Sequence, residues 1–247
     1  MLSDPRNKTV PLLDVILLPW TDENALLVMP VLIQFDRLPF RFLSEVCEFL
    51  EQMFQGLVFM HEHKIAHRDA CWRNLMMDIS KVMPTGYHFS NWMTEDGRKK
   101  PLQWFPRKSV APVKYYYIDF GLSYRFPSDA TNFNLKGVVG QDKTVPEKFV
   151  KGPYDAFKLD IYQLGNVIAE LLENYEGLTV FKGLSELMKN RDPMQRPSAS
   201  DAYETLVDII THLTEEQLNR RVWLKQSPAD LRHRVEFLNE NPVEYYC

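Results

Sequence analysis

The sequence predicts a mixed fold of the α+β class that is mainly α-helical, with a small β-hairpin near the N-terminus. Two apolar patterns predict the helical part: residues 44–61 repeat apolar side chains every three or four positions, and residues 158–174 are apolar on nearly all sides. Aliphatic runs at 9–18 and 25–32, separated by a turn-rich segment, predict the hairpin. With 247 residues, 45% of them apolar, the chain can bury a full core as one large domain or two small lobes.

The predicted helix at 44–61 carries methionine and phenylalanine along its apolar face, which is typical of a core-facing helix rather than of a cofactor site. His61 and His63 near its end are metal-ligating residue types. No carboxylate or thiol cluster completes a metal site around them, so we expect both histidines to be solvated at the surface.

The predicted helix at 158–174 has no polar face and must therefore be buried within the domain. Three further helical patterns follow, at 178–189, at 198–212 and from Thr214 onward. Ser198 opens the second of these, with Asp201 three residues later, which predicts a capping box. The tail to Cys247 has mixed charge and no motif.

Composition bounds the class of protein. The net charge is −4 and the isoelectric point is about 5.9, so there is no basic footprint and nucleic acid is not expected as a partner. The three cysteines, Cys47, Cys71 and Cys247, form no Cys-x-x-Cys pair, which favours a reduced intracellular compartment, the cytoplasm. The longest apolar run, 12–20, is broken by Asp14 and Pro19, so no signal peptide or membrane span is expected.

The residues with the clearest chemistry lie at 67–74. Asp69 is followed five residues later by Asn74, which places a proton acceptor and a neutral oxygen ligand on one loop. This pairing suits phosphoryl transfer, because that reaction needs an oriented hydroxyl and Mg²⁺ to neutralise phosphate charge. A second carboxylate, Asp119, follows the strand predicted at 115–118. Asp69 and Asn74 could instead serve only as Asx turn residues, but a turn does not predict the carboxylate at 119.

With these residues the sequence resembles a eukaryotic protein kinase. Five signatures occur in the order of that family. They are His67-Arg68-Asp69 with Asn74, Asp119-Phe120-Gly121, Val145-Pro146-Glu147, Asp160-Ile161-Tyr162-Gln163-Leu164-Gly165, and the stretch from Arg191 to Arg196-Pro197. The resemblance implies a kinase-like fold in which the helical part is the large lobe and the hairpin is a remnant of the small lobe.

The resemblance also implies catalytic roles. Asp69 would be the catalytic base, and Asn74 and Asp119 would bind Mg²⁺. Serine/threonine kinases usually carry lysine two residues after the aspartate, but Cys71 stands at that position. Arg73 matches the arrangement of tyrosine kinases and could supply the missing charge, so the resemblance leaves the choice between Ser/Thr and Tyr hydroxyls open.

Other residues of the signatures would have structural roles. His67 would pack against Phe120, next to Gly121, and Arg68 would meet a phosphate on the activation segment, residues 119–147. Asp160 would brace the backbone of the catalytic loop. Glu147 and Arg196 would form a buried salt bridge that holds the activation segment to the large lobe.

The segment after the predicted hairpin would form the hinge that binds ATP. Met29 would lie near the gatekeeper position, and adenine would use the carbonyl of Pro30 and the N–H of Leu32. Met76 and Ile118 would complete the nucleotide site. Without the downstream motifs, the same pattern would describe two ordinary core strands.

A long insertion separates Asn74 from Asp119. Residues 83–113 are rich in proline, aromatic residues and lysine, and the Asp96-Gly97 pair predicts a turn. Its basic side chains could dock an acidic substrate, although we expect a solvated loop. They are Arg98, Lys99, Lys100, Arg107 and Lys108. With this insertion the chain resembles a group of kinase-like proteins found in mushroom-forming fungi.

The resemblance divides the chain into small-lobe strands and hinge at 1–33, a large lobe at 34–213, and a C-terminal helix and tail at 214–247. Only eight residues precede Thr9, which leaves no room for the Gly-rich loop, strand lysine and helix glutamate of a kinase. The chain is therefore expected to be either a shortened protein kinase or a reduced pseudokinase scaffold that binds a protein partner. A small-molecule kinase is a third alternative. The oligomeric state stays open.

Overall fold

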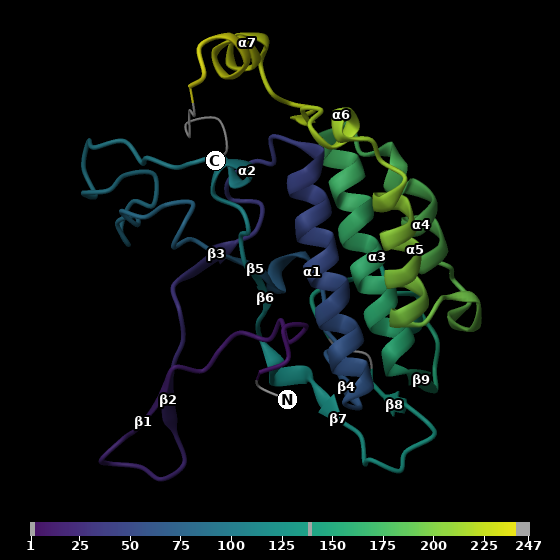
Figure 1. The fold of residues 1–247 in the computed structure, drawn as a ribbon. Helices are drawn as coiled ribbons and strands as arrows, with labels where there is room; N and C mark the ends of the chain where they lie inside the picture. The colour runs from purple at the N-terminus through teal and green to yellow at the C-terminus, as the bar shows by residue number, and fades with distance from the viewer. Residues whose placement is uncertain (1–2, 138–139, 241–247) are drawn as a thin grey trace.

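The computed structural model describes residues 3–137 and 140–240. Its main body is a set of helices that run alongside one another, with small sheets beside them (Figure 1). Helix α1 (Leu43–Glu62) packs against α5 (Ala199–Thr211), and α3 (Ala156–Asn174) packs against α4 (Lys182–Met188). The α+β prediction is confirmed, and both long helices begin and end within two residues of their predicted limits.

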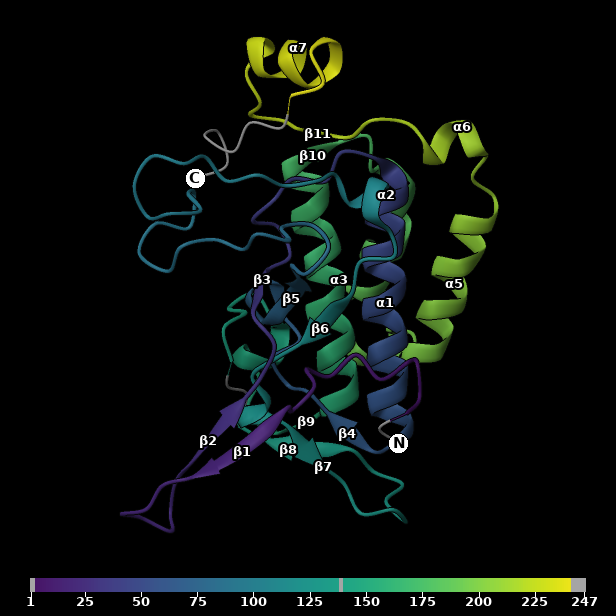
Figure 2. The ribbon, with the colours of Figure 1, turned by 60° about the vertical axis from the view of Figure 1, so that its left-hand side comes forward.

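The hairpin is present but shorter than predicted. Strands β1 (Asp14–Leu17) and β2 (Ala25–Val28) pair antiparallel, with Asp14 opposite Val28. They project away from the helices, and every residue of β1 is exposed (Figure 2). Residues 9–10, which were assigned to the hairpin, instead lie beside Tyr117, and the N–H of Val10 donates to the Tyr117 carbonyl at 3.0 Å. Tyr117 ends β6 (Tyr115–Tyr117), the edge strand of a sheet, and the unpaired side of this strand offers backbone partners that the hairpin does not.

A three-stranded sheet connects the predicted hinge to the predicted catalytic loop. Strand β5 (Leu75–Asp78) lies between β3 (Leu32–Gln34) and β6 (Tyr115–Tyr117), and both pairings are antiparallel. Side chains alternate along β5 and β6, so Leu75, Met77, Tyr115 and Tyr117 are buried in the core. The register places Leu75 opposite Tyr117, so Asn74, which precedes β5, and Ile118, which follows β6, lie at the same end of the sheet.

The remaining elements are short. The predicted helix at 178–189 begins as a 3₁₀ turn, Thr179–Phe181, before α4. Helix α6 (Glu215–Leu218) follows Thr214 as predicted, whereas α7 (Ala229–Phe237) was not predicted. The other strand pairs are β4 (Ile65–Ala66) with β7 (Tyr124–Arg125), β8 (Asn134–Lys136) with β9 (Pro153–Asp155), and β10 (Tyr175–Glu176) with β11 (Trp223–Leu224). Cys247 lies outside the described residues, within which no helix has the length and apolarity needed to cross a membrane.

The insertion is only partly the solvated loop that was expected. The predicted turn is present, with Asp96 Oδ1 accepting the N–H groups of Arg98, Lys99 and Lys100. Arg107, however, is fully buried at the start of helix α2 (Arg107–Val110). Its guanidinium donates to the carbonyls of Phe35 and Leu38 and lies 3.8 Å from the Phe40 ring centroid. The expectation of solvation is wrong for this arginine, which ties the insertion to the chain that follows β3.

Ser198 caps the N-terminus of α5. Ser198 Oγ accepts the N–H of Asp201 at 3.2 Å, and the Asp201 side chain accepts the N–H of Ser198, as the predicted capping box requires. Replacing Ser198 by alanine leaves the Asp201 N–H without its cap. We expect Ser198→Ala to lower the free energy of unfolding by about 1 kcal/mol in a urea titration. An unchanged midpoint would show that the cap contributes nothing.

Candidate active site

The predicted catalytic loop lies between β4 and β5 and ends in a 3₁₀ turn, Trp72–Asn74. Asp69 is 2% exposed and Asn74 is 3% exposed. The Asn74 carboxamide donates to Asp69 Oδ2 at 3.0 Å and to the Asp69 carbonyl at 2.8 Å. The five-residue spacing therefore brings the carboxylate and the carboxamide into direct contact, with the Asn74 oxygen turned away from that contact.

The N-terminal end of α3 holds this loop through Asp160. Asp160 is fully buried, and its carboxylate accepts the backbone N–H of His67 at 2.8 Å and that of Arg68 at 2.6 Å. The same carboxylate lies 3.0 Å from His61 Nε2, and the His61 ring stacks on Phe157. The expectation that His61 is a solvated surface histidine is therefore wrong, because the second half of the chain folds back over it.

The signature histidine is buried among aromatic rings. The His67 ring lies 4.9 Å from Phe120 and 5.4 Å from Tyr117, and both contacts are tilted. Burial lowers the pKa of His67, which favours the neutral imidazole. A neutral ring suits its two partners, because Nδ1 can accept the Asp69 N–H while Nε2–H donates to the Ile118 carbonyl at 3.0 Å.

Arg68 is expected from the resemblance to meet a phosphate, and in this structure it meets neutral groups. Its guanidinium donates to the Tyr154 hydroxyl at 2.9 Å, to the Leu122 carbonyl at 2.9 Å and to the Gly137 carbonyl at 3.1 Å. These acceptors come from the activation segment and from β9. Arg68 therefore connects the loop to the segment through hydrogen bonds to uncharged acceptors.

Asp119 lies beside the same loop. The Ile118 N–H donates to the Asn74 carbonyl at 3.0 Å, so the residue before Asp119 is bonded directly to the predicted metal ligand. Asp119 itself has a left-handed backbone, with φ of +61°, and its exposed carboxylate accepts the Gly121 N–H at 3.4 Å. A left-handed non-glycine residue is uncommon, and such strain is found often at functional sites.

The predicted nucleotide-binding residues are arranged along one sheet. Leu32 on β3 lies opposite Asp78, Met76 is at the middle of β5, and Ile118 follows β6. Because the Phe35 N–H bonds the Leu75 carbonyl, the alternation of an antiparallel ladder directs the Leu32 N–H away from β5. That N–H is thereby left for a partner on the other side. Met29, 47% exposed, and Pro30 lie in the segment that connects β2 to β3.

The activation segment makes a close contact with Asp69 that the sequence did not indicate. The Gln141 N–H donates to Asp69 Oδ1 at 2.9 Å, and its side-chain amide donates to Asn74 Oδ1 at 3.3 Å. Gly140 has φ of +116°, and a Cβ built there would lie 2.8 Å from Asp69 Oδ1. The glycine at position 140, where a side chain would collide with Asp69, was the available sequence signal of such a close approach.

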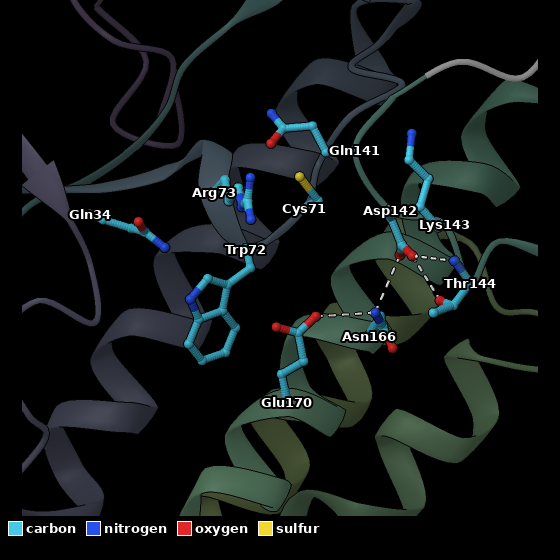
Figure 3. A pocket seen from close by; sticks show the side chains of 10 residues that line it. All are labelled: Gln34, Cys71, Trp72, Arg73, Gln141, Asp142, Lys143, Thr144, Asn166 and Glu170. Carbon is cyan, nitrogen blue, oxygen red and sulfur yellow. Dashed lines mark hydrogen bonds between the residues drawn. The ribbon is translucent and has the colours of Figure 1, made fainter. Parts of the chain in front are cut away.

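A cavity of about 800 Å³ opens beside this contact (Figure 3). The catalytic loop, the activation segment, β3 and α3 contribute its lining, which consists of Gln34, Cys71, Trp72, Arg73, Gln141, Asp142, Lys143, Thr144, Asn166 and Glu170. The Asn166 amide bridges Asp142 and Glu170, at 3.3 and 3.2 Å. Burial, with Asp142 nearby, raises the pKa of Glu170. Charged and amide side chains thus line a cavity that is large enough for a substrate side chain.

Cys71 and Arg73 line this cavity, and they differ in whether they could supply the positive charge of the lysine that the loop lacks. Burial raises the pKa of the Cys71 thiol to about 12, so this cysteine stays protonated and offers neither charge nor a nucleophile. Arg73 is exposed and lines the same cavity, as does Lys143. Positive charge at this cavity therefore comes from Arg73 and Lys143.

The ion pair between Glu147 and Arg196 is present. Arg196 Nη1 bonds Glu147 Oε1, and the two side chains are 0% and 6% exposed. Arg196 also donates to the carbonyls of Lys158 and Asn190, and its guanidinium lies 4.9 Å from the Tyr162 ring centroid. The pair ties the end of the activation segment to the chain just before α5, and the bond from Arg196 to the Lys158 carbonyl continues this connection to the start of α3.

Mg²⁺ takes oxygen ligands and keeps several waters when it binds a protein. The Asn74 carboxamide oxygen and the Asp119 carboxylate are ligands of this type, and Asn74 Oδ1 faces only a neutral amide. Within the part of the chain that the structure describes, no group of three His, Cys, Asp or Glu side chains could hold a metal by itself. The residues thus fit an ion that shares its ligands with phosphate oxygens and water.

Comparison with known proteins identifies the class. A match to the protein kinase domain family covers residues 41–229, more than half of the chain. The chain therefore belongs to the protein kinase family, and its fold is the α+β kinase-like fold. Over 134 residues it is 28% identical to the serine/threonine-protein kinase PTK2/STK2 of Saccharomyces cerevisiae. That stretch is 54% of this chain and 14% of the yeast protein, so the chain matches only a small part of the relative's length.

Proposed function

We propose that this chain carries the site of an ATP- and Mg²⁺-dependent protein kinase that transfers a phosphoryl group to a protein hydroxyl. In this proposal Asp69 accepts the hydroxyl proton, Arg73 contributes positive charge, and Asn74 and Asp119 hold the metal. Mg²⁺, when bound with ATP, supplies charge neutralisation at the transferred phosphate. The yeast relative is named as a serine/threonine kinase, which favours a Ser or Thr acceptor here.

The contact between Asp69 and Asn74 supports this proposal most directly. It joins a buried carboxylate to a carboxamide whose oxygen points elsewhere, next to a cavity of about 800 Å³. Asp69 needs to orient a hydroxyl more than to react covalently, because phosphoryl transfer depends on positioning and electrostatics. A turn that merely caps backbone N–H groups would not require these two side chains to bond each other.

The proposal includes a division of the chain. Residues 1–33 would form small-lobe strands and hinge, 34–213 the large lobe with its insertion at about 83–113, and 214–247 a C-terminal helix and tail. Met29, Pro30, Leu32, Met76 and Ile118 would contact the nucleotide. The outward direction of the Leu32 N–H supports this assignment.

The proposal is tested by incubating the purified chain with γ-labelled ATP, Mg²⁺ and a mixture of unrelated proteins as acceptors. We expect label on protein that is lost when Mg²⁺ is chelated, because Asn74 and Asp119 would then lose their ion. Label that persists without Mg²⁺ would contradict the assignment. Acid stability of the product would distinguish a hydroxyl phosphate from a phosphorylated histidine or carboxylate.

A second candidate is a pseudokinase that binds a protein partner without phosphoryl transfer. The Gln141 contacts favour it, because they place protein donors on Asp69 Oδ1 and on Asn74 Oδ1, the two oxygens that the reaction would use. A catalytic protein must open these contacts before it turns over.

Gln141→Ala separates the two candidates. Removing the amide frees Asn74 Oδ1 of a bond of about 1 kcal/mol, so a catalytic protein should bind Mg²⁺-ATP about five-fold more tightly, measured by isothermal titration calorimetry. The exposed Gln226→Ala is the control for loss of an amide elsewhere. If neither the wild type nor Gln141→Ala binds Mg²⁺-ATP, the pseudokinase is favoured.

A further inference from the structure

Gln163 lies on α3 three residues after Asp160, which places both side chains on the same face of the helix. Gln163 is 1% exposed, so its amide has to find partners inside the protein. Both partners belong to the catalytic loop. The Gln163 oxygen accepts the Ala70 N–H at 2.9 Å, and its nitrogen donates to the Arg68 carbonyl at 3.3 Å.

These two bonds lie on either side of Asp69. The Arg68 carbonyl belongs to the peptide that enters Asp69, and the Ala70 N–H belongs to the peptide that leaves it. Asp160 already holds the N–H groups of His67 and Arg68, so α3 holds backbone groups before and after the aspartate. With both adjoining peptides fixed, the Cα–Cβ direction of Asp69 is fixed, and the bonds from Asn74 and Gln141 then orient its carboxylate.

The backbone of this loop needs such support. Arg68 has a left-handed conformation, with φ of +66°, which costs a non-glycine residue free energy unless surrounding contacts maintain it. Asp160 bonds the N–H of Arg68 and Gln163 bonds its carbonyl. The two side chains together therefore hold both backbone polar groups of the strained residue that precedes Asp69.

We infer that Gln163 is a positioning residue, which sets the orientation of Asp69 for proton acceptance from the acceptor hydroxyl. This inference rests on the phosphoryl-transfer function proposed above. Gln163 stands within the Asp-x-Tyr-x-x-Gly signature, at a position that the signature leaves unspecified. It touches no reacting atom, and it acts only through the backbone of the loop.

Gln163→Met tests the inference, because methionine has similar length but can neither accept from Ala70 nor donate to Arg68. Gln52→Met is the matched control. The Gln52 amide makes the same pair of bonds to backbone groups outside the loop, donating to the Val113 carbonyl at 2.7 Å and accepting the Tyr115 N–H at 3.1 Å. Both variants lose two side-chain bonds to backbone, so both should lose stability.

The kinetic arm is measured at a temperature well below both melting transitions. We expect Gln163→Met to lower kcat by about 100-fold, as a misplaced reacting group does, with KM for ATP changed by less than about two-fold. Gln52→Met should keep kcat within about two-fold of the wild type. An equal loss of kcat in both variants, or no loss in Gln163→Met, would overturn the positioning role.

The second experiment measures hydrogen–deuterium exchange and does not require phosphoryl transfer. Hydrogen–deuterium exchange should be about ten-fold faster at the Ala70 amide in Gln163→Met but unchanged there in Gln52→Met. If the wild type shows no phosphoryl transfer, the proposed function fails, yet exchange still decides whether Gln163 holds the loop. Unchanged exchange at Ala70 would overturn the inference whatever the activity. Should Gln163→Met not fold, Gln163→Ala, which also loses both bonds, takes its place in both arms, with Gln52→Ala as its control.

Discussion

Asp69→Asn should lower the rate of phosphoryl transfer by about 10²- to 10⁴-fold, the range that a positioned general base contributes. Asparagine keeps one oxygen that can accept the Gln141 N–H, and although it loses the second acceptor oxygen, the Asn74 amide keeps its bond to the carbonyl of residue 69. Asparagine has no negative charge and cannot take a proton at neutral pH. The fold should therefore persist. Initial rates of transfer from labelled ATP and a thermal melt of the same preparation measure both effects.

The control for Asp69→Asn is the same change at Asp208, on the outer face of α5, where the carboxylate is 73% exposed. Asp208→Asn should leave the transfer rate unchanged. If Asp69→Asn transferred phosphate at the wild-type rate, Asp69 would not be the base. A destabilised melt in Asp69→Asn would assign the loss of rate to folding instead.

Arg196→Met should lower the free energy of unfolding by roughly 3–5 kcal/mol, because it leaves the Glu147 carboxylate buried without its partner. The effect is large since native proteins of this kind are stable by only about 5–15 kcal/mol. Chemical denaturation monitored by tryptophan fluorescence measures it. Limited proteolysis should also cut the activation segment faster, because Glu147 no longer holds its end.

An exposed ion pair supplies the comparison. Lys182 and Glu186 lie 3.8 Å apart on α4, and both side chains are 68% exposed. Glu186→Gln should change the free energy of unfolding by less than about 1 kcal/mol, because water already solvates both charges. Losses of similar size in Glu186→Gln and Arg196→Met would show that the Glu147–Arg196 pair is no stronger than a surface pair.

The parts of the fold that the sequence predicted well are those governed by local periodicity and short spacings. The helices around 44–61 and 158–174 follow from apolar patterns, and the cap at Ser198 follows from residues three positions apart. The spacing of Asp69 and Asn74 likewise predicts their proximity. α7 was missed because its apolar periodicity is weak, with only Leu231 and Val235 buried.

The residues that sequence reasoning missed make contacts between distant segments. His61 and Asp160 are 99 residues apart, and Gln163 bonds a loop 93 residues earlier. Arg107 looked like one more basic side chain of a solvated loop, yet its partners are carbonyls near residue 35. No local pattern in a single sequence encodes such pairs, since any buried polar side chain can be satisfied by a backbone group elsewhere.

The central claim, a metal-nucleotide site formed with Asn74 and Asp119, is tested most directly by a thermal shift of the purified chain with Mg²⁺ and ATP. Ligand at ten times its dissociation constant adds about 1.4 kcal/mol to stability, which corresponds to roughly 3–6 °C for a domain of this size. We predict a shift in this range for the wild type, and none for Asp119→Ala. A cooperative melt that does not move at millimolar ATP would contradict the claim.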